Sequence, residues 1–294
     1  MGRTITVDPV TRVEGHAKIV LDLDDGGKIV KGHLQVLEIR GFEKLVEKME
    51  LFKMPQIIAR ICGVCPAAQH LASVIAIENG LGVSPPVDAR LLRELMYMGH
   101  LLHSHALSTF LLAGPDLFAG IGAKPESRSI FGILDLDAEL AKKVLRLRSI
   151  GQRVVEIVGG RGVHPVSAVP GGMAGRPDRE KLELIVGWGG EAISILDEIT
   201  PVVMERLDAL GELRAAALVP LNSMGLSNEG VVGYLEGNAV VVTAQGETVR
   251  TFAAADYAEH LVEHVMPSSH MKSVNLRSAD PAGYFVGPLA RLNV

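Results

Sequence analysis

The sequence predicts an α+β protein with a mostly helical core, a small N-terminal antiparallel sheet and a second short β patch. Three observations favour this class. The first forty residues alternate apolar and polar side chains, which is the period of a half-buried strand. From Gly41 onward, apolar residues recur every three or four positions, which is the period of an amphipathic helix. Finally, a chain of 294 residues that is 48% hydrophobic can bury a substantial core.

The N-terminal sheet is predicted from three alternating segments, residues 4–8, 16–22 and 29–38. The Asp-Asp-Gly-Gly of residues 24–27 separates two of these segments and is typical of a tight turn. Strands joined by so short a turn pair in antiparallel fashion. We therefore expect a β-rich part over residues 1–40.

The helical part is predicted from six stretches that carry apolar residues at helical intervals and are separated by Gly and Pro clusters. They span residues 44–51, 55–61, 66–79, 87–113, 137–158 and 179–210. Strand-like patterns return at Ala239–Val242 and Thr248–Phe252, and residues 255–264 look helical again. Because no repeat or long linker marks a boundary, we expect a single domain over residues 1–294, with its helical core at 41–294.

Charge and hydropathy argue against two classes of partner. With 29 basic and 34 acidic residues, a net charge of -5 gives no electrostatic reason to expect nucleic acid or an anionic membrane surface. The most apolar stretch, Leu101–Ala123, is interrupted by His103, His105 and Pro115, so no membrane span is expected. Residues 1–10 lack the features of an export signal, so we expect a cytoplasmic location.

The two cysteines, Cys62 and Cys65, form one Cys-x-x-Cys motif. In the cytoplasm they are not expected to form a disulfide framework. Thiolates are soft ligands, and two at this spacing can grip one metal ion or a pair of ions from one side. Pro66 suits the first turn of a helix, so Cys65 is expected at a helix N-terminus, which favours a thiolate. A thioredoxin-like dithiol, half of a zinc site and two buried core residues remain as alternatives.

Five motifs in a fixed order place the cysteines in a wider pattern. They read DPVTRVEGHAKI at 8–19, RGFEK at 40–44, ARICGVC at 59–65, GGRGVHPVSAVPGG at 159–172 and GPLARLNV at 287–294. In this order they closely resemble the large subunit of NiFe hydrogenases, and most of all the cytoplasmic F420-non-reducing and NAD-linked branches. The resemblance implies the fold of that large subunit, and with it the reversible heterolytic cleavage of dihydrogen at a thiolate-ligated nickel-iron centre.

The same resemblance assigns metal ligands. Cys62 matches a terminal nickel ligand and Cys65 a thiolate that bridges nickel and iron, the iron carrying cyanide and carbonyl ligands. Family members take two further thiolates from a second Cys-x-x-Cys near their end, and this sequence has no such motif. We therefore expect that a C-terminal segment is missing. A truncated chain, a large subunit split into two polypeptides and a relative that has lost the metal all remain open.

Two glutamates receive roles from the resemblance. Glu14 matches the first proton relay beside a nickel-bound thiolate. Cleaving dihydrogen heterolytically releases a proton that a nearby carboxylate can carry away. Glu43 matches a ligand of a buried magnesium ion, which prefers oxygen ligands in octahedral geometry. Both glutamates could instead be exposed surface residues, Glu14 on the opening sheet and Glu43 at the start of the helix at 43–50.

The residues after the motif depart from the family. Four positions after the second cysteine, where the family usually has a histidine that hydrogen-bonds the bridging sulfur, this sequence has Gln69, followed by His70. Gln69 can still donate an N–H to a thiolate. His70 could replace the usual group after a local shift, although one helical step turns it about 100° away. Both are candidates for contact with the cofactor, and the departure puts activity in doubt rather than fold.

Other histidines are not assigned as ligands. His100, His103 and His105 lie in an apolar helical stretch, where a packed and hydrogen-bonded core is favoured over a metal site. His164 precedes a proline among glycines and is interpreted as a loop residue beneath the active-site region.

A partner protein is also expected. An iron–sulfur cluster usually takes four cysteines, and the two in this sequence are already committed, so electrons must leave through another protein. The resemblance implies a hydrogenase small subunit that carries iron–sulfur clusters, with further electron-transfer subunits beyond it. The alternative function is a metal-free component like that of respiratory complex I, or a degenerate scaffold of an electron-transfer complex.

Overall fold

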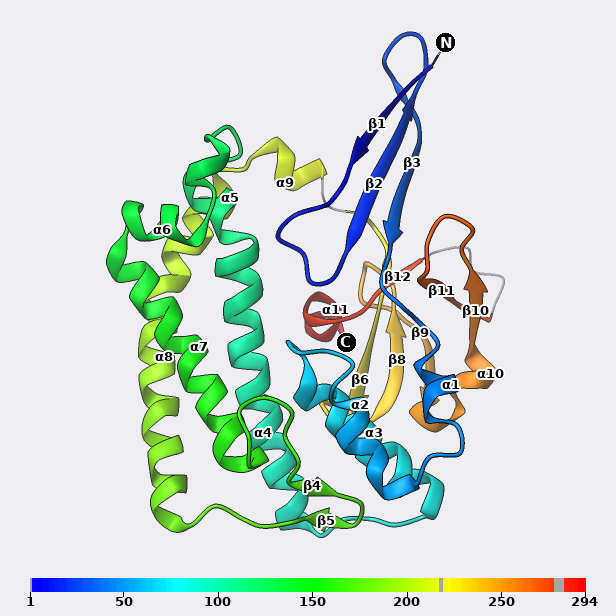
Figure 1. Ribbon diagram of the computed structural model, residues 1–294, viewed down its shortest axis with the longest axis vertical. Helices are drawn as coiled ribbons and strands as arrows, with labels where there is room; N and C mark the ends of the chain where they lie inside the picture. Colours follow the sequence, from blue (N-terminus) through cyan, green and yellow to red (C-terminus); the bar gives the residue numbers. More distant parts are fainter. Residues whose placement is uncertain (1, 217–218, 278–282) are drawn as a thin grey trace. The chain divides into compact units, whose positions relative to one another are not determined.

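The computed structural model describes residues 2–216, 219–277 and 283–294, and it confirms the α+β class (Figure 1). The residues group into two compact units, Lys48–Val219 and the pair of segments Met1–Glu47 and Pro220–Val294. The second unit therefore combines the two ends of the chain. That all residues act as one domain stays a prediction.

Three antiparallel strands form the predicted N-terminal sheet in the order β1–β2–β3: β1 (Arg3–Val7), β2 (Ala17–Leu23) and β3 (Ile29–Val36). Ile5 lies opposite Leu21 in the register, so apolar residues of neighbouring strands share one face. The turn at 24–27 forms because Oδ1 of Asp24 accepts hydrogen bonds from the backbone of Gly26 and Lys28, each at 2.9 Å.

The predicted second β patch is a larger sheet that runs β12–β6–β8–β9, with β7 paired to β6. Its strands are β6 (Asn222–Asn228), β7 (Val231–Val232), β8 (Asn238–Val242), β9 (Thr248–Ala253) and β12 (Tyr284–Phe285). Val241 and Phe252 lie in its buried core. The short helices of this unit are α1 (Phe42–Val46), η4 (Ala254–Asp256), α10 (Tyr257–His260) and α11 (Pro288–Asn293).

The prediction of a helix over 255–264 is wrong in its second half. Helix α10 ends at His260, and β10 (Leu261–Val265) follows it and pairs antiparallel with β11 (Lys272–Leu276). The segment Leu-Val-Glu-His-Val suits either structure, and the nearby partner strand decides the outcome because it satisfies the backbone hydrogen bonds.

The helical unit contains the predicted long helices α3 (Pro66–Leu81), α4 (Val87–Ala106), α7 (Ala138–Gly159) and α8 (Arg179–Asp208). Helix α4 continues into a π-helical turn, η2 (Leu107–Leu112). Shorter elements connect them: η1 (Leu51–Lys53), α2 (Met54–Ile58), α5 (Gly114–Ala119), η3 (Pro125–Ser127), α6 (Ile130–Leu136), the hairpin of β4 (Ala168–Val169) and β5 (Gly172–Met173), and α9 (Glu212–Ala216). Within the described ranges, no helix is long and apolar enough to cross a membrane.

Helix α7 packs against both α4 and α8, and the three run side by side (Figure 1). The approach of α4 to α7 is close because glycines face each other there: a Cβ on Gly99 would lie 2.7 Å from Cβ of Val154. Asp137 and Asp178 cap the N-termini of α7 and α8 by accepting backbone hydrogen bonds. The core of this unit contains Ala106, Phe110, Ile133, Leu140, Ala141, Val144, Leu147, Ile150, Ala192, Ile195 and Ile199.

Candidate metal centre

Both cysteines lie at the start of α3. Cys62 is on the loop that connects α2 to α3, and Cys65 is the N-cap residue of α3, with Pro66 as the first helical residue. This confirms the predicted place of Cys65 at a helix N-terminus. The first N–H groups of α3 have no partner within the helix, so the site carries a local positive potential that favours a thiolate.

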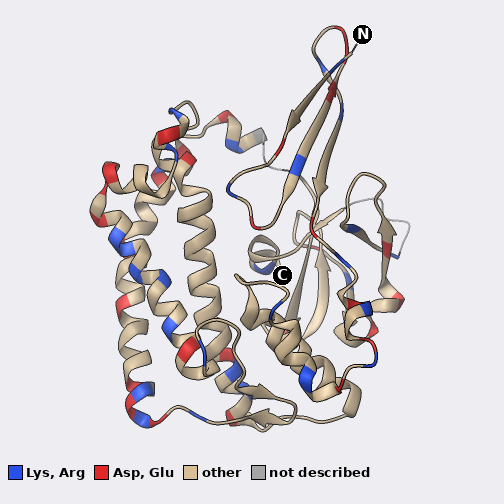
Figure 2. Ribbon diagram, viewed as in Figure 1, with Lys and Arg blue, Asp and Glu red and all other residues tan. Residues whose placement is uncertain are grey.

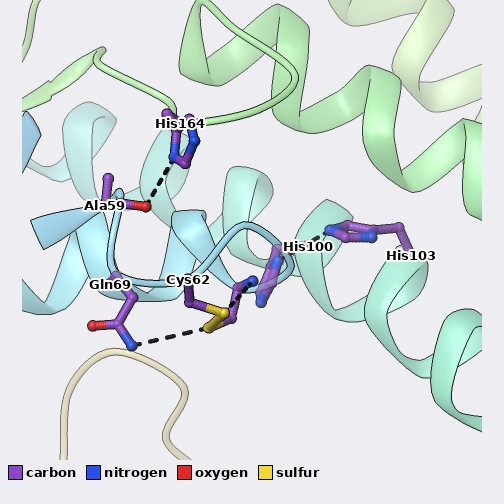
Figure 3. Close-up of a disulfide and its surroundings, with 7 residues drawn as sticks. Ala59, Cys62, Gln69, His100, His103 and His164 are labelled. Atoms are coloured by element: carbon purple, nitrogen blue, oxygen red, sulfur yellow. Dashed lines mark hydrogen bonds between the residues drawn. A yellow bond between two sulfur atoms is a disulfide. The ribbon is translucent and has the colours of Figure 1, made fainter. Parts of the chain in front are cut away.

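The two sulfur atoms are in contact, and the structure joins them as a disulfide with the Cα atoms 5.5 Å apart (Figure 3). A disulfide was not expected from the sequence. The Cys-x-x-Cys turn brings both side chains to one side of the loop, and that convergence is also what chelation of a metal by two reduced thiolates requires. The backbone N–H of Cys65 donates to Sγ of Cys62 at 3.1 Å, which would stabilise negative charge on that sulfur.

Gln69 faces the second cysteine. Its Nε2 donates to Sγ of Cys65 at 3.9 Å, one helical turn along α3 (Figure 3). His70 is buried, and its Nδ1 lies 3.2 Å from the carbonyl oxygen of Pro55 on α2. Burial lowers the pKa of His70, so the neutral form is favoured. Of the two candidates for contact with a cofactor, the structure thus brings Gln69 beside the sulfur and His70 against α2, and both roles stay predictions.

A histidine from a distant loop supports the cysteine loop. His164 follows α7, has a positive φ of 55°, and its Nδ1 lies 2.9 Å from the carbonyl oxygen of Ala59 (Figure 3). Ala59 is fully buried and stands three residues before Cys62. A left-handed backbone costs energy for a residue with a side chain, so this contact has to be held by its surroundings. The loop position that the sequence indicated for His164 is confirmed.

The helical histidines are packed core residues. His100 and His103 are buried, and Nδ1 of His100 lies 3.2 Å from Nε2 of His103 (Figure 3). Burial lowers the pKa of each from 6.5 to about 4, with repulsion from neighbouring cationic groups acting in the same direction. His105 is held through Nδ1 by the carbonyl oxygen of Leu101 at 2.6 Å. These contacts match the expected hydrogen-bonded core.

The two glutamates lie in the other compact unit. Glu14 is exposed on the connection between β1 and β2. Glu43 is on α1, with a side chain that is 64% exposed and an Oε1 that lies 3.9 Å from Nζ of Lys272. That lysine is also 2.5 Å from Oε2 of Glu263. Their assignments as proton relay and magnesium ligand stay predictions.

An ion pair that was not predicted from the sequence lies at the far end of α3. The guanidinium of Arg93 on α4 donates to both carboxylate oxygens of Glu78, at 2.8 and 2.7 Å, and both side chains are almost fully buried. Arg93 also donates to the carbonyls of Val169 and Gly172, and Glu78 accepts from the N–H of Gly171 at 2.7 Å. The pair thus ties α3 and α4 to the β4–β5 hairpin. Its signal in the sequence is a charged residue at an apolar position of each helix.

The cysteine pair fits half of a soft-metal site. Two sulfurs converge, and an amide and a glutamine side chain donate to them, which suits thiolate ligands. Among the residues that the structure describes, no group of three or more His, Cys, Asp or Glu side chains is placed to hold a metal ion. A four-coordinate or two-metal centre would therefore need ligands in addition to this pair.

The chain is similar to known protein families and to individual relatives. The family "Nickel-dependent hydrogenase" matches residues 40–123, and "HoxL-like" matches residues 4–39. One subunit of the vhu F420-non-reducing hydrogenase of Methanococcus voltae is 35% identical to the chain and is matched over 100% of this chain and 70% of its own length. The beta subunit of the NAD-reducing hydrogenase HoxS of Cupriavidus necator is 31% identical and is matched over 100% and 64%.

A solved structure agrees with the sequence matches. An NAD+-reducing nickel-iron hydrogenase in its H2-reduced state superposes on the chain with a TM-score of 0.94 at 34% identity. The match covers 99% of this chain and 66% of the other. The chain thus spans about two thirds of the length of such relatives, and the resemblance that the five motifs indicated is confirmed.

Proposed function

The chain belongs to the large-subunit family of nickel-dependent hydrogenases, which are oxidoreductases, and from that premise we propose that Cys62 and Cys65 supply two of four thiolates for a centre that cleaves dihydrogen reversibly. The observation that carries the proposal is the convergence of both sulfurs at the N-terminus of α3. When bound, a nickel-iron centre with cyanide and carbonyl ligands on iron would polarise dihydrogen and accept its electrons.

The residues of this chain would hold and move the proton. The N–H of Cys65 and the amide of Gln69 donate to the two sulfurs, and both bonds would stabilise thiolate charge in the reduced site. A nickel-bound thiolate would accept the proton when dihydrogen is cleaved, and we assign the next transfer to the carboxylate of Glu14. An exposed carboxylate suits this task because it can pass the proton on to water.

Glu43 is proposed as a ligand of a structural magnesium ion. A single carboxylate satisfies only part of the octahedral shell of Mg²⁺, so retained waters and further oxygen ligands would complete it. Lys272 contacts the same carboxylate across 3.9 Å and would have to give way to the cation. If this assignment holds, the ammonium group of Lys272 and Mg²⁺ compete for the carboxylate of Glu43.

An iron–sulfur protein is proposed as the electron-transfer partner. The sequence contains two cysteines, and both are used by the proposed centre, so the chain lacks ligands for a cluster of its own. Relatives are named as subunits, among them one of the vhu F420-non-reducing hydrogenase and the beta subunit of HoxS. We infer a hydrogenase small subunit, with further electron-transfer subunits beyond it. A metal-free scaffold is not favoured, because the matching proteins are hydrogenases and both cysteines are kept together.

The test is an infrared spectrum with nickel and iron analysis of the complex purified with its natural partners. Cyanide and carbonyl bands with near-equimolar nickel are expected, together with loss of nickel by an order of magnitude or more in Cys62→Ser and Cys65→Ser. Absence of both the bands and nickel from intact, matured complex would overturn the proposal. Ser73→Ala, a substitution at a buried position on α3, provides the matched control.

A further inference from the structure

The loop that carries the two cysteines is anchored differently at its two ends. Cys65 begins α3, and Pro66 behind it is buried, so that end is fixed by the helix itself. Cys62 lies between Ala59, the C-cap residue of α2, and the exposed Gly63. The place of the Cys62 sulfur relative to that of Cys65 therefore depends on how the end of α2 is held.

The loop offers one charged side chain for an ion pair. From Met54 to Ile77 the sequence contains a single Asp, Glu, Lys or Arg, which is Arg60, and few charges are drawn along this part of the ribbon (Figure 2). The guanidinium of Arg60 donates to the backbone carbonyl of Gln56 in α2. The end of α2 is thus held by packing and by hydrogen bonds to its backbone.

Two imidazoles from outside α2 reach its carbonyl oxygens. Nδ1 of His70 on α3 lies 3.2 Å from the oxygen of Pro55. Nδ1 of His164 lies 2.9 Å from the oxygen of Ala59 (Figure 3). Because a carbonyl oxygen only accepts, Nδ1 of His164 carries a proton and donates it to this bond. Ala59 is fully buried, so bulk water cannot take the place of that donor. His164 thus holds the end of α2 that lies next to Cys62.

His164 is itself held by the end of α7. Pro165 is buried and packs against Gly159, where an added Cβ would lie 2.6 Å from Cβ of Pro165. The side chain of Gln152 on α7 donates to the carbonyl of Gly162. These contacts fold the loop after α7 back onto the helix, and they fix the backbone on both sides of His164.

The conformation of His164 restricts which residues can replace it. Its φ of 55° lies in the left-handed region, which Gly, Asn and Asp adopt more readily than most residues. Asn offers an N–H two bonds beyond Cβ, as Nδ1 of histidine does. Asp has the shape of Asn without the donor, and Gly has no side chain. Substitution by these three residues therefore separates backbone conformation from hydrogen bonding.

We propose that His164 is a positioning residue for the cysteine pair: it donates to Ala59, fixes the end of α2, and so holds Cys62 where its sulfur meets that of Cys65. The use of the pair as metal ligands rests on the proposed function, whereas the positioning does not. The donor reaches the carbonyl across 105 positions of sequence. The geometry of the pair is thus set by the loop after α7 as well as by α3.

The thiol–disulfide equilibrium with glutathione tests this positioning in the full chain, without metal. The two cysteine thiols give two electrons and two protons to glutathione disulfide, which becomes two glutathione thiols. The equilibrium constant reports the effective concentration of the two thiols for each other. We expect it to fall at least about tenfold in His164→Gly and to stay within about threefold of wild type in His164→Asn. Equal constants for wild type and His164→Gly would overturn the proposal, as would a His164→Asn chain that behaves like His164→Gly.

A control variant separates positioning from lost stability. His105→Ala removes an imidazole whose Nδ1 lies 2.6 Å from the carbonyl oxygen of Leu101, a contact of the same kind that does not reach the cysteine loop. Its thiol equilibrium should stay within about threefold of wild type even where its melting temperature falls. A decrease as large as that of His164→Gly would show that stability moves the equilibrium, and the proposal would fail.

His164→Asp keeps the test decisive if the His164→Gly chain does not fold. It differs from His164→Asn in lacking the donor, so its equilibrium constant should lie about tenfold below that of His164→Asn. Equal constants in these two variants would contradict the role of the hydrogen bond.

Metal binding gives a second readout. The affinity of the reduced chain for Ni²⁺ should fall about tenfold in His164→Gly and recover in His164→Asn. Infrared and nickel analysis of the wild-type complex decides whether the pair serves a nickel-iron centre, whereas the thiol equilibrium decides the role of His164. The two proposals can therefore fail separately.

Discussion

Gln69 donates a hydrogen bond from Nε2 to Sγ of Cys65 across 3.9 Å. The contact arises because the two residues are four positions apart on α3, the separation that brings side chains onto one helical face. It gives the sulfur a neutral amide donor, in place of the titratable imidazole that the resemblance implies for this position.

Removing this donor should weaken metal binding at the cysteine pair. Gln69→Leu keeps a similar shape but cannot donate, so we expect the affinity of the reduced chain for Ni²⁺ to fall about tenfold, as for other lost hydrogen bonds to metal ligands. Competition with a chromophoric chelator measures it. Gln69→His, which offers an N–H again, should retain most of the affinity, and equal loss in both variants would contradict a hydrogen-bonding role.

Glu14 is expected to matter for turnover and not for assembly. Glu14→Gln keeps the size of the side chain but removes the proton carrier, so dihydrogen oxidation by the complex should fall by about 10² to 10⁴. Infrared bands and nickel content should match the wild type. Glu47→Gln, which removes an exposed carboxylate on the same unit, is the control. A Glu14→Gln complex with full activity would exclude Glu14 as the relay.

The buried pair of Glu78 and Arg93 should be costly to break from one side. In Glu78→Gln the guanidinium keeps a full charge in an apolar interior without a carboxylate, so we expect a loss of about 3–5 kcal/mol in the free energy of unfolding. Urea denaturation measures this. The exposed pair of Arg179 and Glu183 gives the comparison, and Glu183→Gln should cost less than about 1 kcal/mol. Equal effects would show that burial does not set the cost.

Close packing of α4 on α7 predicts opposite outcomes for two Gly→Ala substitutions. A Cβ at Gly99 would lie 2.7 Å from Cβ of Val154, so Gly99→Ala should destabilise the chain by about 1–3 kcal/mol. A Cβ at Gly187 on α8 would meet nothing within 4 Å, and Gly187→Ala should be stabilising by up to about 1 kcal/mol through helix propensity. Thermal melts of both variants check the difference in sign.

The buried histidines predict that stability falls on mild acidification. The pKa of His100 and of His103 is about 4 in the folded chain against 6.5 as the ordinary value, so the unfolded state binds more protons between these values. The contribution of these two histidines to the free energy of unfolding is therefore almost complete above pH 6.5. It decreases toward pH 4, by about 2 kcal/mol per imidazole between pH 7 and pH 5. The two groups titrate as a pair.

Urea denaturation at pH 7 and at pH 5 measures this loss in the free energy of unfolding. His103→Gln removes one of the two imidazoles and should make the loss between these pH values smaller. His264→Gln removes an exposed imidazole and serves as the control. A pH dependence that is the same in His103→Gln and wild type would contradict the assignment.

Local pattern predicted much of this protein. Alternation specified β1 to β3, the Asp24 turn and the strands near Val241, because strand period and turn chemistry depend on neighbouring residues. Helical period located α3, α4, α7 and α8, and Pro66 placed Cys65 at an N-cap. Five motifs predicted the family, and Gln69 lies beside a sulfur because four residues make about one helical turn.

The tertiary structure decided what depends on distant residues. The partner strand β11 turned residues 261–265 from helix to strand, and a hairpin 93 positions from Glu78 completes the site of Glu78 and Arg93. His164 reaches the carbonyl of Ala59 across 105 positions of sequence. In each case the outcome is set by backbone hydrogen bonding or burial between segments that no local pattern connects.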